Sequence, residues 1–161
     1  MKYIACIGSR VLFPDEKELC FNIGKSLVQK GYCIKSGNAI GADQSYASGA
    51  NSVNPQSVYI YLPYPKYNRD KIVPGNYFME NPNPEWFNVA AFYHSNWGSL
   101  SQGIRKLHAR NVGIVDGVEF VIAFPNQQGG GGTGMGMRIA AANGITVYNL
   151  RDDKNCLKGI L

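Results

Sequence analysis

The sequence predicts an α/β protein built on an open, doubly wound parallel sheet of about five or more strands flanked by helices. Short β-compatible runs alternate with stretches of helical period, a spacing that suits parallel strands joined by crossover helices. The run VEFVIAF at 118–124 is almost wholly apolar, as expected of a central strand buried on both faces. Three glycine-bearing segments each follow a predicted strand, where open parallel sheets bind ligands.

The first unit is predicted to be a strand, a helix and a second strand. Residues 2–7 form a short apolar run that ends at a glycine, and apolar residues then repeat at helical spacing over residues 14–30. Gly31 is a natural helix stop, because glycine tolerates the left-handed backbone that ends many helices. Residues 32–35 predict the second strand.

The next predicted unit is a helix and a third strand, after which the alternation stops. The helix runs from Asp43, whose carboxylate can cap a first turn, to about Val53, and SVYIYL at 57–62 is the strand. Residues 64–97 are rich in proline and aromatic residues and show no clean period. We expect an irregular insert there, serving as a lid, as a flap that packs its own aromatic rings, or as a subunit interface.

The C-terminal third restores the alternation. SLSQ at 99–102 matches a capping box that begins a helix reaching to about Asn111. The strand at 118–124 leads into the glycine run, residues 137–143 predict a further helix, and residues 145–149 predict a fifth strand. A chain of this length suits one compact domain, so residues 1–161 are predicted to form a single unit.

Composition restricts the classes of protein and partner. Apolar residues make up 45% of the chain and charged residues 17%, unlike a disordered chain. The net charge of +5 favours an anionic partner, although scattered solvated lysines give the same value. Cys6, Cys20 and Cys33 lie in apolar stretches and are interpreted as buried free thiols. No signal peptide or stretch near the ~20 apolar residues of a membrane span is seen, so we expect a cytoplasmic protein without a membrane partner.

The three glycine-bearing segments are candidate phosphate sites. A glycine-rich turn leading into a helix presents backbone N–H groups and the positive end of the helix dipole, although each segment also suits a simple tight turn. Arg110 either offers a planar fork for phosphate or carboxylate or is a helix-surface arginine, and Arg10 is either a phosphate ligand or a solvated arginine. The predicted binding residues are Gly8, Ser9 and Arg10; Ser36, Gly37, Asn38, Gly41 and Asp43; Arg110; and Gly129, Gly130, Gly131, Gly132 and Thr133.

No catalytic residue, metal site or required cofactor is predicted. His94 and His108 have no carboxylate at relay or ligand spacing and are interpreted as structural or surface residues. The chain also lacks the lysine-bearing P-loop pattern and the three-glycine fingerprint of dinucleotide folds.

The motifs IGSR, SGNAIGAD, HARN, GGGGT and NGITVYNL follow one another in an order that resembles the SLOG superfamily of Rossmann-like nucleotide-binding proteins. This superfamily includes the LONELY GUY phosphoribohydrolases, molybdenum-cofactor carrier proteins and DNA-processing protein A. SGNAIGAD at 36–43 is the most specific match. The resemblance covers most of the chain except 64–97 and the final residues. It implies that the 36–43 loop belongs to the ligand site, that Arg110 lies beside a ligand phosphate, and that the chain forms a homo-oligomer.

One departure from the family pattern bears on function. The family's P-G-G-x-G-T-x-x-E places Gly136 where phosphoribohydrolases carry their catalytic glutamate. The resemblance therefore implies a protein that binds a nucleotide or nucleotide-derived ligand without the family's hydrolase chemistry. Two alternatives stay open: a phosphoribohydrolase acting on nucleoside monophosphates with Glu80 or Glu85 as its carboxylate, and single-stranded DNA binding like that of DNA-processing protein A.

Overall fold

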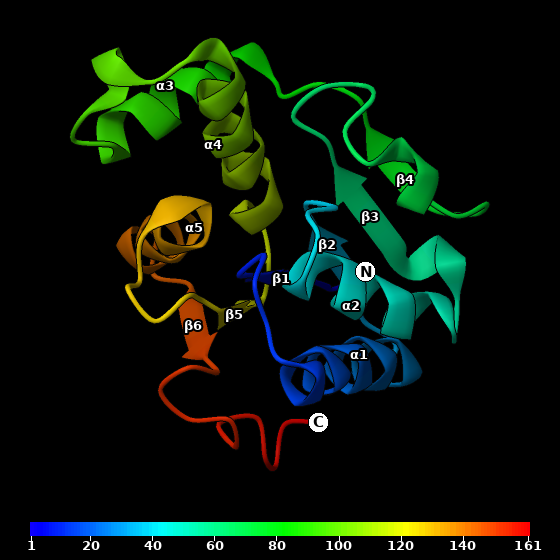
Figure 1. The fold of residues 1–161 in the computed structure, drawn as a ribbon. Coiled ribbons are helices and arrows are strands. Elements are labelled where there is room, and N and C mark those ends of the chain that lie inside the picture. The colour runs from blue at the N-terminus through cyan, green and yellow to red at the C-terminus, as the bar shows by residue number, and fades with distance from the viewer.

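Six parallel strands form one sheet in the computed structural model, which describes residues 1–161 (Figure 1). The strands are β1 (Tyr3–Gly8), β2 (Cys33–Ser36), β3 (Val58–Tyr61), β4 (Tyr77–Met79), β5 (Phe120–Phe124) and β6 (Thr146–Asn149). Their order is β4-β3-β2-β1-β5-β6, and every neighbouring pair is parallel. The chain thus proceeds from β1 to one edge and then returns to β5 on the other side of β1. The predicted doubly wound parallel sheet is confirmed.

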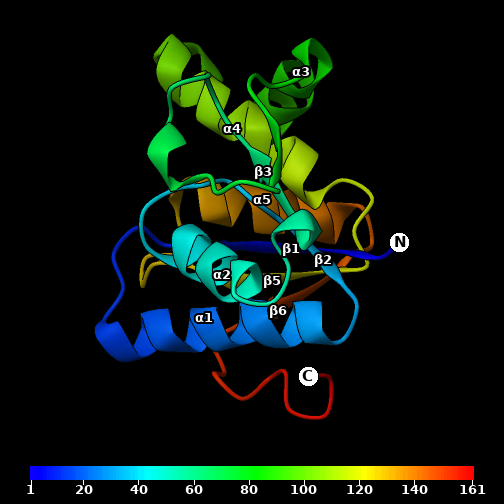
Figure 2. The same cartoon turned by 90° about the vertical axis from the view of Figure 1, so that its right-hand side faces the viewer.

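The helices cover both faces of this sheet (Figure 2). They are α1 (Pro14–Gln29), α2 (Ala42–Asn51), α3 (Pro84–Tyr93), α4 (Gln102–Val115) and α5 (Gly131–Ala142). Figure 2 shows α1 and α2 below the strands, with α3, α4 and α5 above them. Because strand side chains alternate between faces, Ile4 and Cys6 pack in the α1–α2 core, whereas Ala5 and Ile7 pack in the α4–α5 core.

Local signals explain where α1 begins and ends. Pro14 occupies the first helical position, and Oε1 of Glu16 accepts a hydrogen bond from the Phe13 backbone N–H at 2.9 Å. Gly31 has φ +90°, so the predicted helix stop is confirmed. The helix packs closely on α2, since a Cβ at Gly24 would lie 2.0 Å from the Tyr46 carbonyl oxygen.

Residues 64–97 are more regular than predicted. They contain β4, which extends the sheet as a sixth strand, and the ten-residue helix α3. All three side chains of β4 are exposed, so the strand shows no alternation of buried and exposed residues. Helix α3 buries only Ala90 fully, which likewise hides its period.

Two helices begin elsewhere than predicted. Ser101, not Ser99, caps α4: its Oγ accepts from the Ile104 N–H at 3.3 Å, while Ser99 Oγ donates to the Asn96 carbonyl at 2.8 Å. Helix α5 begins at Gly131, six residues before the predicted start at 137. The sequence does not indicate this start, because the first turn is rich in glycine, whose intrinsic helix propensity is low. Asp43 lies within the first turn of α2 rather than at its N-cap, which is Gly41.

Cys6, Cys20 and Cys33 are buried free thiols, as predicted. None of the helices combines the length and apolarity that a membrane span requires.

Candidate functional site

A cavity of about 660 Å³ opens beside the carboxyl ends of β1 and β5. These strands are neighbours in space, with Gly8 paired to Phe124, yet the chain leaves them toward opposite edges of the sheet. Ligands of open parallel sheets bind at this switch point of the topology. The walls come from β1 and its following loop, the start of α2, the buried side of α4, the 126–133 loop and Arg151.

The N-terminus of α5 forms one wall of the cavity. Gly130 is the N-cap and provides no side-chain hydrogen bond, and Gly130, Gly131, Gly132 and Thr133 all line the cavity. First-turn N–H groups have no acceptor within their own helix, and the helix dipole adds partial positive charge there. This wall therefore suits an anion.

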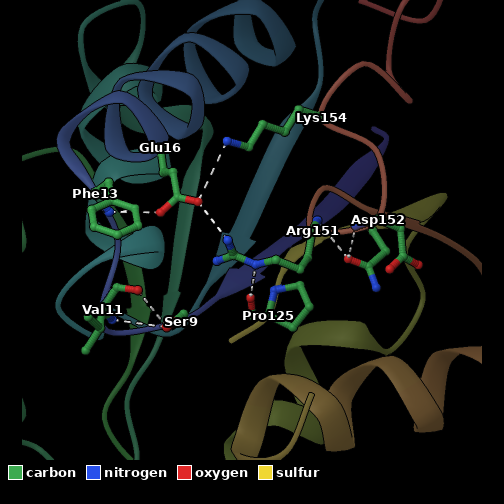
Figure 3. Close-up of polar contacts among 9 residues, drawn as sticks. Ser9, Val11, Phe13, Glu16, Pro125, Arg151, Asp152 and Lys154 are labelled. Carbon is green, nitrogen blue, oxygen red and sulfur yellow. Dashed lines mark hydrogen bonds and ion pairs between the residues drawn. The ribbon is translucent and has the colours of Figure 1, made fainter. Parts of the chain in front are cut away.

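The N-terminus of α1 meets the same cavity, but the protein's own carboxylate already occupies it. Glu16 accepts from the Phe13 N–H through Oε1 and pairs through Oε2 with Nη1 of Arg151 at 2.8 Å (Figure 3). The Arg151 guanidinium also lies 4.4 Å from the Phe124 ring centroid and donates from Nε to the Pro125 carbonyl at 3.0 Å. Of these two helix starts, α5 is the one left for a ligand.

Glu16 and Arg151 are cavity residues that the sequence prediction missed. They stand 135 positions apart, so no local pattern connects them. The one local signal is the position of Glu16, three residues after Phe13, where a glutamate can cap a helix. This signal predicts the start of a helix and not a residue of the cavity.

Arg110 lines the cavity but is held largely by the protein. It is buried, donates from Nη1 to the carbonyls of Gly37 and Tyr61, and donates from Nε to Oδ1 of Asn111 at 2.8 Å. A Cβ at Gly37 would lie 2.7 Å from the Arg110 Cζ, so the glycine leaves room for the guanidinium. The Tyr67 side chain also lies against the guanidinium, so most of the Arg110 side chain is held by protein groups.

Asp43 also lines the cavity and is 5% exposed. Its Oδ2 accepts from the Ala39 N–H at 3.3 Å, whereas Oδ1 accepts no hydrogen bond within the protein. Burial raises the pKa of Asp43 to about 6, against the opposing effect of the Arg110 guanidinium. The cavity thus contains a buried carboxylate oxygen that needs a donor.

His108 is the second residue of the cavity wall with a buried atom that has no hydrogen-bond partner. Its Nδ1 makes no hydrogen bond, and its ring lies 5.0 Å from that of His94. Burial lowers the pKa of His108 to about 4, with a smaller effect from His94, so the imidazole is neutral at pH 7. The sequence interpretation of His108 as a structural or surface residue overlooked its place in the cavity.

The predicted binding residues divide into two groups. Nine of them line the cavity: Gly8, Ser9, Arg10, Asp43, Arg110, Gly130, Gly131, Gly132 and Thr133. Ser36, Gly37, Asn38, Gly41 and Gly129 do not. Ser36 Oγ donates to the Cys6 carbonyl at 2.7 Å, and Nδ2 of Asn38 donates to the Asn68 carbonyl at 2.8 Å, so these two side chains hold the 36–43 loop in place.

Gly136 lies in the core rather than in the cavity. A Cβ at this position would lie 3.0 Å from Ile7 Cδ1 and 3.7 Å from Val115 Cγ1. Glu80 and Glu85 do not line the cavity either, and Glu80 pairs at the surface with Arg69 at 3.4 Å. The carboxylates that the fold brings to the cavity are Asp43 and Glu16.

No residue of the insert lines the cavity. Its first part instead supports the 36–43 loop, since the Tyr67 and Asn68 carbonyls accept hydrogen bonds from Nδ2 of Asn38. The Tyr67 ring also lies 5.4 Å from the Arg110 guanidinium of α4. The interface role of the insert stays a prediction, which sedimentation velocity would test. The structure brings together no three metal-ligating side chains that could hold an ion.

No protein-family model matches the sequence, and no curated protein matches it significantly. Solved structures match the fold. DNA processing protein A from Helicobacter pylori, described for its single-stranded DNA binding mode, superposes with a TM-score of 0.66 at 18% identity, covering 92% of this chain and 64% of that one. DNA processing protein A from Streptococcus pneumoniae gives a TM-score of 0.65 at 19% identity, covering 92% and 49%.

A third structure, that of the protein TM1055, gives a TM-score of 0.59 at 18% identity, covering 91% of this chain and 72% of that one. The present chain spans 64% and 49% of the two DNA processing proteins, so it corresponds to one part of each. The chain therefore shares the Rossmann-like fold of these three structures, and the fold predicted from its motifs is confirmed.

Proposed function

We propose that this protein binds a nucleotide or nucleotide-derived ligand in the cavity, with a phosphate at the N-terminus of α5. The observation that carries the proposal is the uncapped start of α5 at Gly130, which shares one cavity with two unsatisfied buried polar atoms. An anion at the helix start would satisfy the first-turn amides.

The rest of the cavity suits the other parts of a nucleotide. Val11, Phe13 and Ile104 supply apolar surface for a base, and each is substantially exposed. Arg10 and Arg110 supply positive charge to the cavity wall. A cavity of this size is typical of small-ligand sites.

A thermal-shift panel tests this proposal. It would contain nucleoside mono-, di- and triphosphates, cyclic nucleotides, NAD and ADP-ribose. A ligand at a hundred times its Kd stabilises the folded state by about 2.7 kcal/mol, so at least one member should raise the Tm by several degrees. No shift with any member at millimolar concentration would overturn the proposal.

Single-stranded DNA binding is a second candidate, favoured by the fold likeness to DNA processing protein A and by the net charge of +5. Its signature is affinity for a fluorescent oligonucleotide that falls steeply with salt, because phosphate contacts release counterions. Absent or salt-independent binding would exclude it. The phosphoribohydrolase alternative loses its suggested carboxylates, since Glu80 and Glu85 lie outside the cavity.

A further inference from the structure

Two buried side-chain atoms in this protein have no hydrogen-bond partner, Oδ1 of Asp43 and Nδ1 of His108. Both residues are more than nine-tenths buried, and both line the same cavity. An unsatisfied buried polar group destabilises a fold, so native proteins retain few of them, and those retained are often functional. Their shared location indicates a polar ligand.

Asp43 places a requirement on that ligand. The nearby Arg110 guanidinium directs Nε and Nη1 to protein oxygens, and Oδ2 of Asp43 is already used by the Ala39 N–H. Oδ1 therefore remains as an acceptor. An ionised carboxylate only accepts hydrogen bonds, and it repels a phosphate oxygen. The ligand group at this position must be a donor without negative charge.

The cavity wall connects this acceptor to the phosphate position. The Gly132 carbonyl at the start of α5 accepts from Asn111 Nδ2 at 3.2 Å, and Oδ1 of the same side chain accepts from Arg110 Nε. The Asp43 carboxylate lies close to this chain, near enough for the Arg110 guanidinium to lower its pKa. In a nucleotide the sugar follows the phosphate, so a ligand bound at α5 brings its sugar before its base to this polar wall.

We propose that Oδ1 of Asp43 accepts a hydrogen bond from a ribose hydroxyl of the bound nucleotide, so that the site selects ribonucleotides over nucleotides that lack this hydroxyl. This inference rests on the proposed function, because it requires the phosphate to bind at α5. It also distinguishes the two candidate functions, since DNA has no 2′-hydroxyl to offer.

Isothermal titration of the full chain tests the inference. The titrants are the four ribonucleoside 5′-monophosphates, with their 2′-deoxy and 3′-deoxy counterparts. We expect the protein to bind at least one ribonucleotide and to lose about tenfold or more in affinity when one hydroxyl is removed, the loss typical of a missing hydrogen bond to a charged group. In Asp43→Asn this selectivity should disappear.

Asp43→Asn keeps nearly the same side-chain shape and changes one hydrogen-bonding property. The Ala39 N–H requires the amide oxygen at the Oδ2 position, so the amide NH₂ takes the Oδ1 position and an acceptor becomes a donor. Asp116→Asn is the control, since it removes one carboxylate charge outside the cavity and should keep the selectivity. Circular dichroism and the Tm confirm that both variants fold.

The outcomes separate the two proposals. If ribonucleotides and both deoxy forms bind with equal affinity, the ribose assignment is overturned while the proposed function stands. The same holds if Asp43→Asn keeps the full selectivity, because the hydroxyl then binds elsewhere or the donor belongs to the base. If neither these titrants nor any member of the thermal-shift panel binds, the proposed function fails and the inference fails with it.

Discussion

Nη1 of Arg151 lies 2.8 Å from Oε2 of Glu16, and this ion pair joins the last segment of the chain to the first turn of α1 (Figure 3). The Glu16 side chain is only 4% exposed and the Arg151 side chain 23%. Both line the proposed ligand cavity. The pair thus holds one wall of the cavity together.

Replacing Arg151 with alanine should lower the free energy of unfolding by about 2 kcal/mol, because a nearly buried carboxylate loses its closest cation. Lys154→Ala is the matched control. Lys154 lies 3.9 Å from the same oxygen but is 52% exposed, so its loss should change stability by less than about 1 kcal/mol. Urea unfolding at pH 7 measures both variants. Equal effects would show that the closer and more buried contact of Arg151 with Glu16 adds no stability of its own.

Asp43→Asn should stabilise the ligand-free protein at pH 7. The folded-state pKa of Asp43 is raised from 3.8 to about 6, so the folded state holds its proton more tightly than the unfolded state does. The resulting stability is fully present below pH 3.8 and is lost as the pH rises through 6. Between pH 4 and pH 8, the free energy of unfolding of Asp43→Asn should rise relative to that of the wild type by on the order of 1–3 kcal/mol. A constant difference between the two proteins would contradict the prediction.

His108 should make the protein less stable as the solution becomes more acidic. Its folded-state pKa is lowered from 6.5 to about 4, so the unfolded state takes up the proton first. Stability should fall as the pH drops from 6.5 toward 4, and His108→Gln should remove this part of the pH dependence. Urea unfolding of the wild type and of His108→Gln at a series of pH values measures this dependence. His94→Gln is the control for the loss of an imidazole. If the free energy of unfolding of His108→Gln falls with pH as steeply as that of the wild type, His108 is not the group responsible.

Gly131→Ala should weaken phosphate binding more than stability alone explains. Gly131 has φ +74° at the start of α5, and Gly144 has φ +73° just past its end, with open space around both. Alanine strains the backbone equally at the two positions, which costs about 1 kcal/mol of stability. Only the change at 131 moves the first-turn amides. Titration with adenosine monophosphate and inorganic phosphate should show weakened binding for Gly131→Ala alone.

Gly136→Glu should destabilise the fold severely without creating hydrolase activity. A Cβ at 136 lies 3.0 Å from Ile7 Cδ1 inside the core, so a glutamate there buries a charge and overpacks the helix against the sheet. A loss of more than about 3 kcal/mol is expected by urea unfolding. A stable variant that releases free base from nucleoside monophosphates would show that position 136 faces the ligand after all.

The order of strands and helices was predictable because it depends on local patterns. The buried run that forms β5, the helical repeat of α1 and the stop at Gly31 are properties of neighbouring residues. The sheet class and the location of the site at the strand ends follow from that order. Glycine-rich α5 and the exposed strand β4 escaped prediction, because packing against the sheet decides their conformation and their propensities do not.

The sequence by itself determined a doubly wound sheet with glycine loops at one edge, since periodicity and turn chemistry act over a few residues. Tertiary structure alone decided what each loop does there. It directed Nη1 of Arg110 to two backbone carbonyls, placed Glu16 of α1 against Arg151, and left Oδ1 of Asp43 without a partner in the protein. These outcomes depend on distances between residues far apart in the chain, and the local pattern of a sequence does not contain such distances.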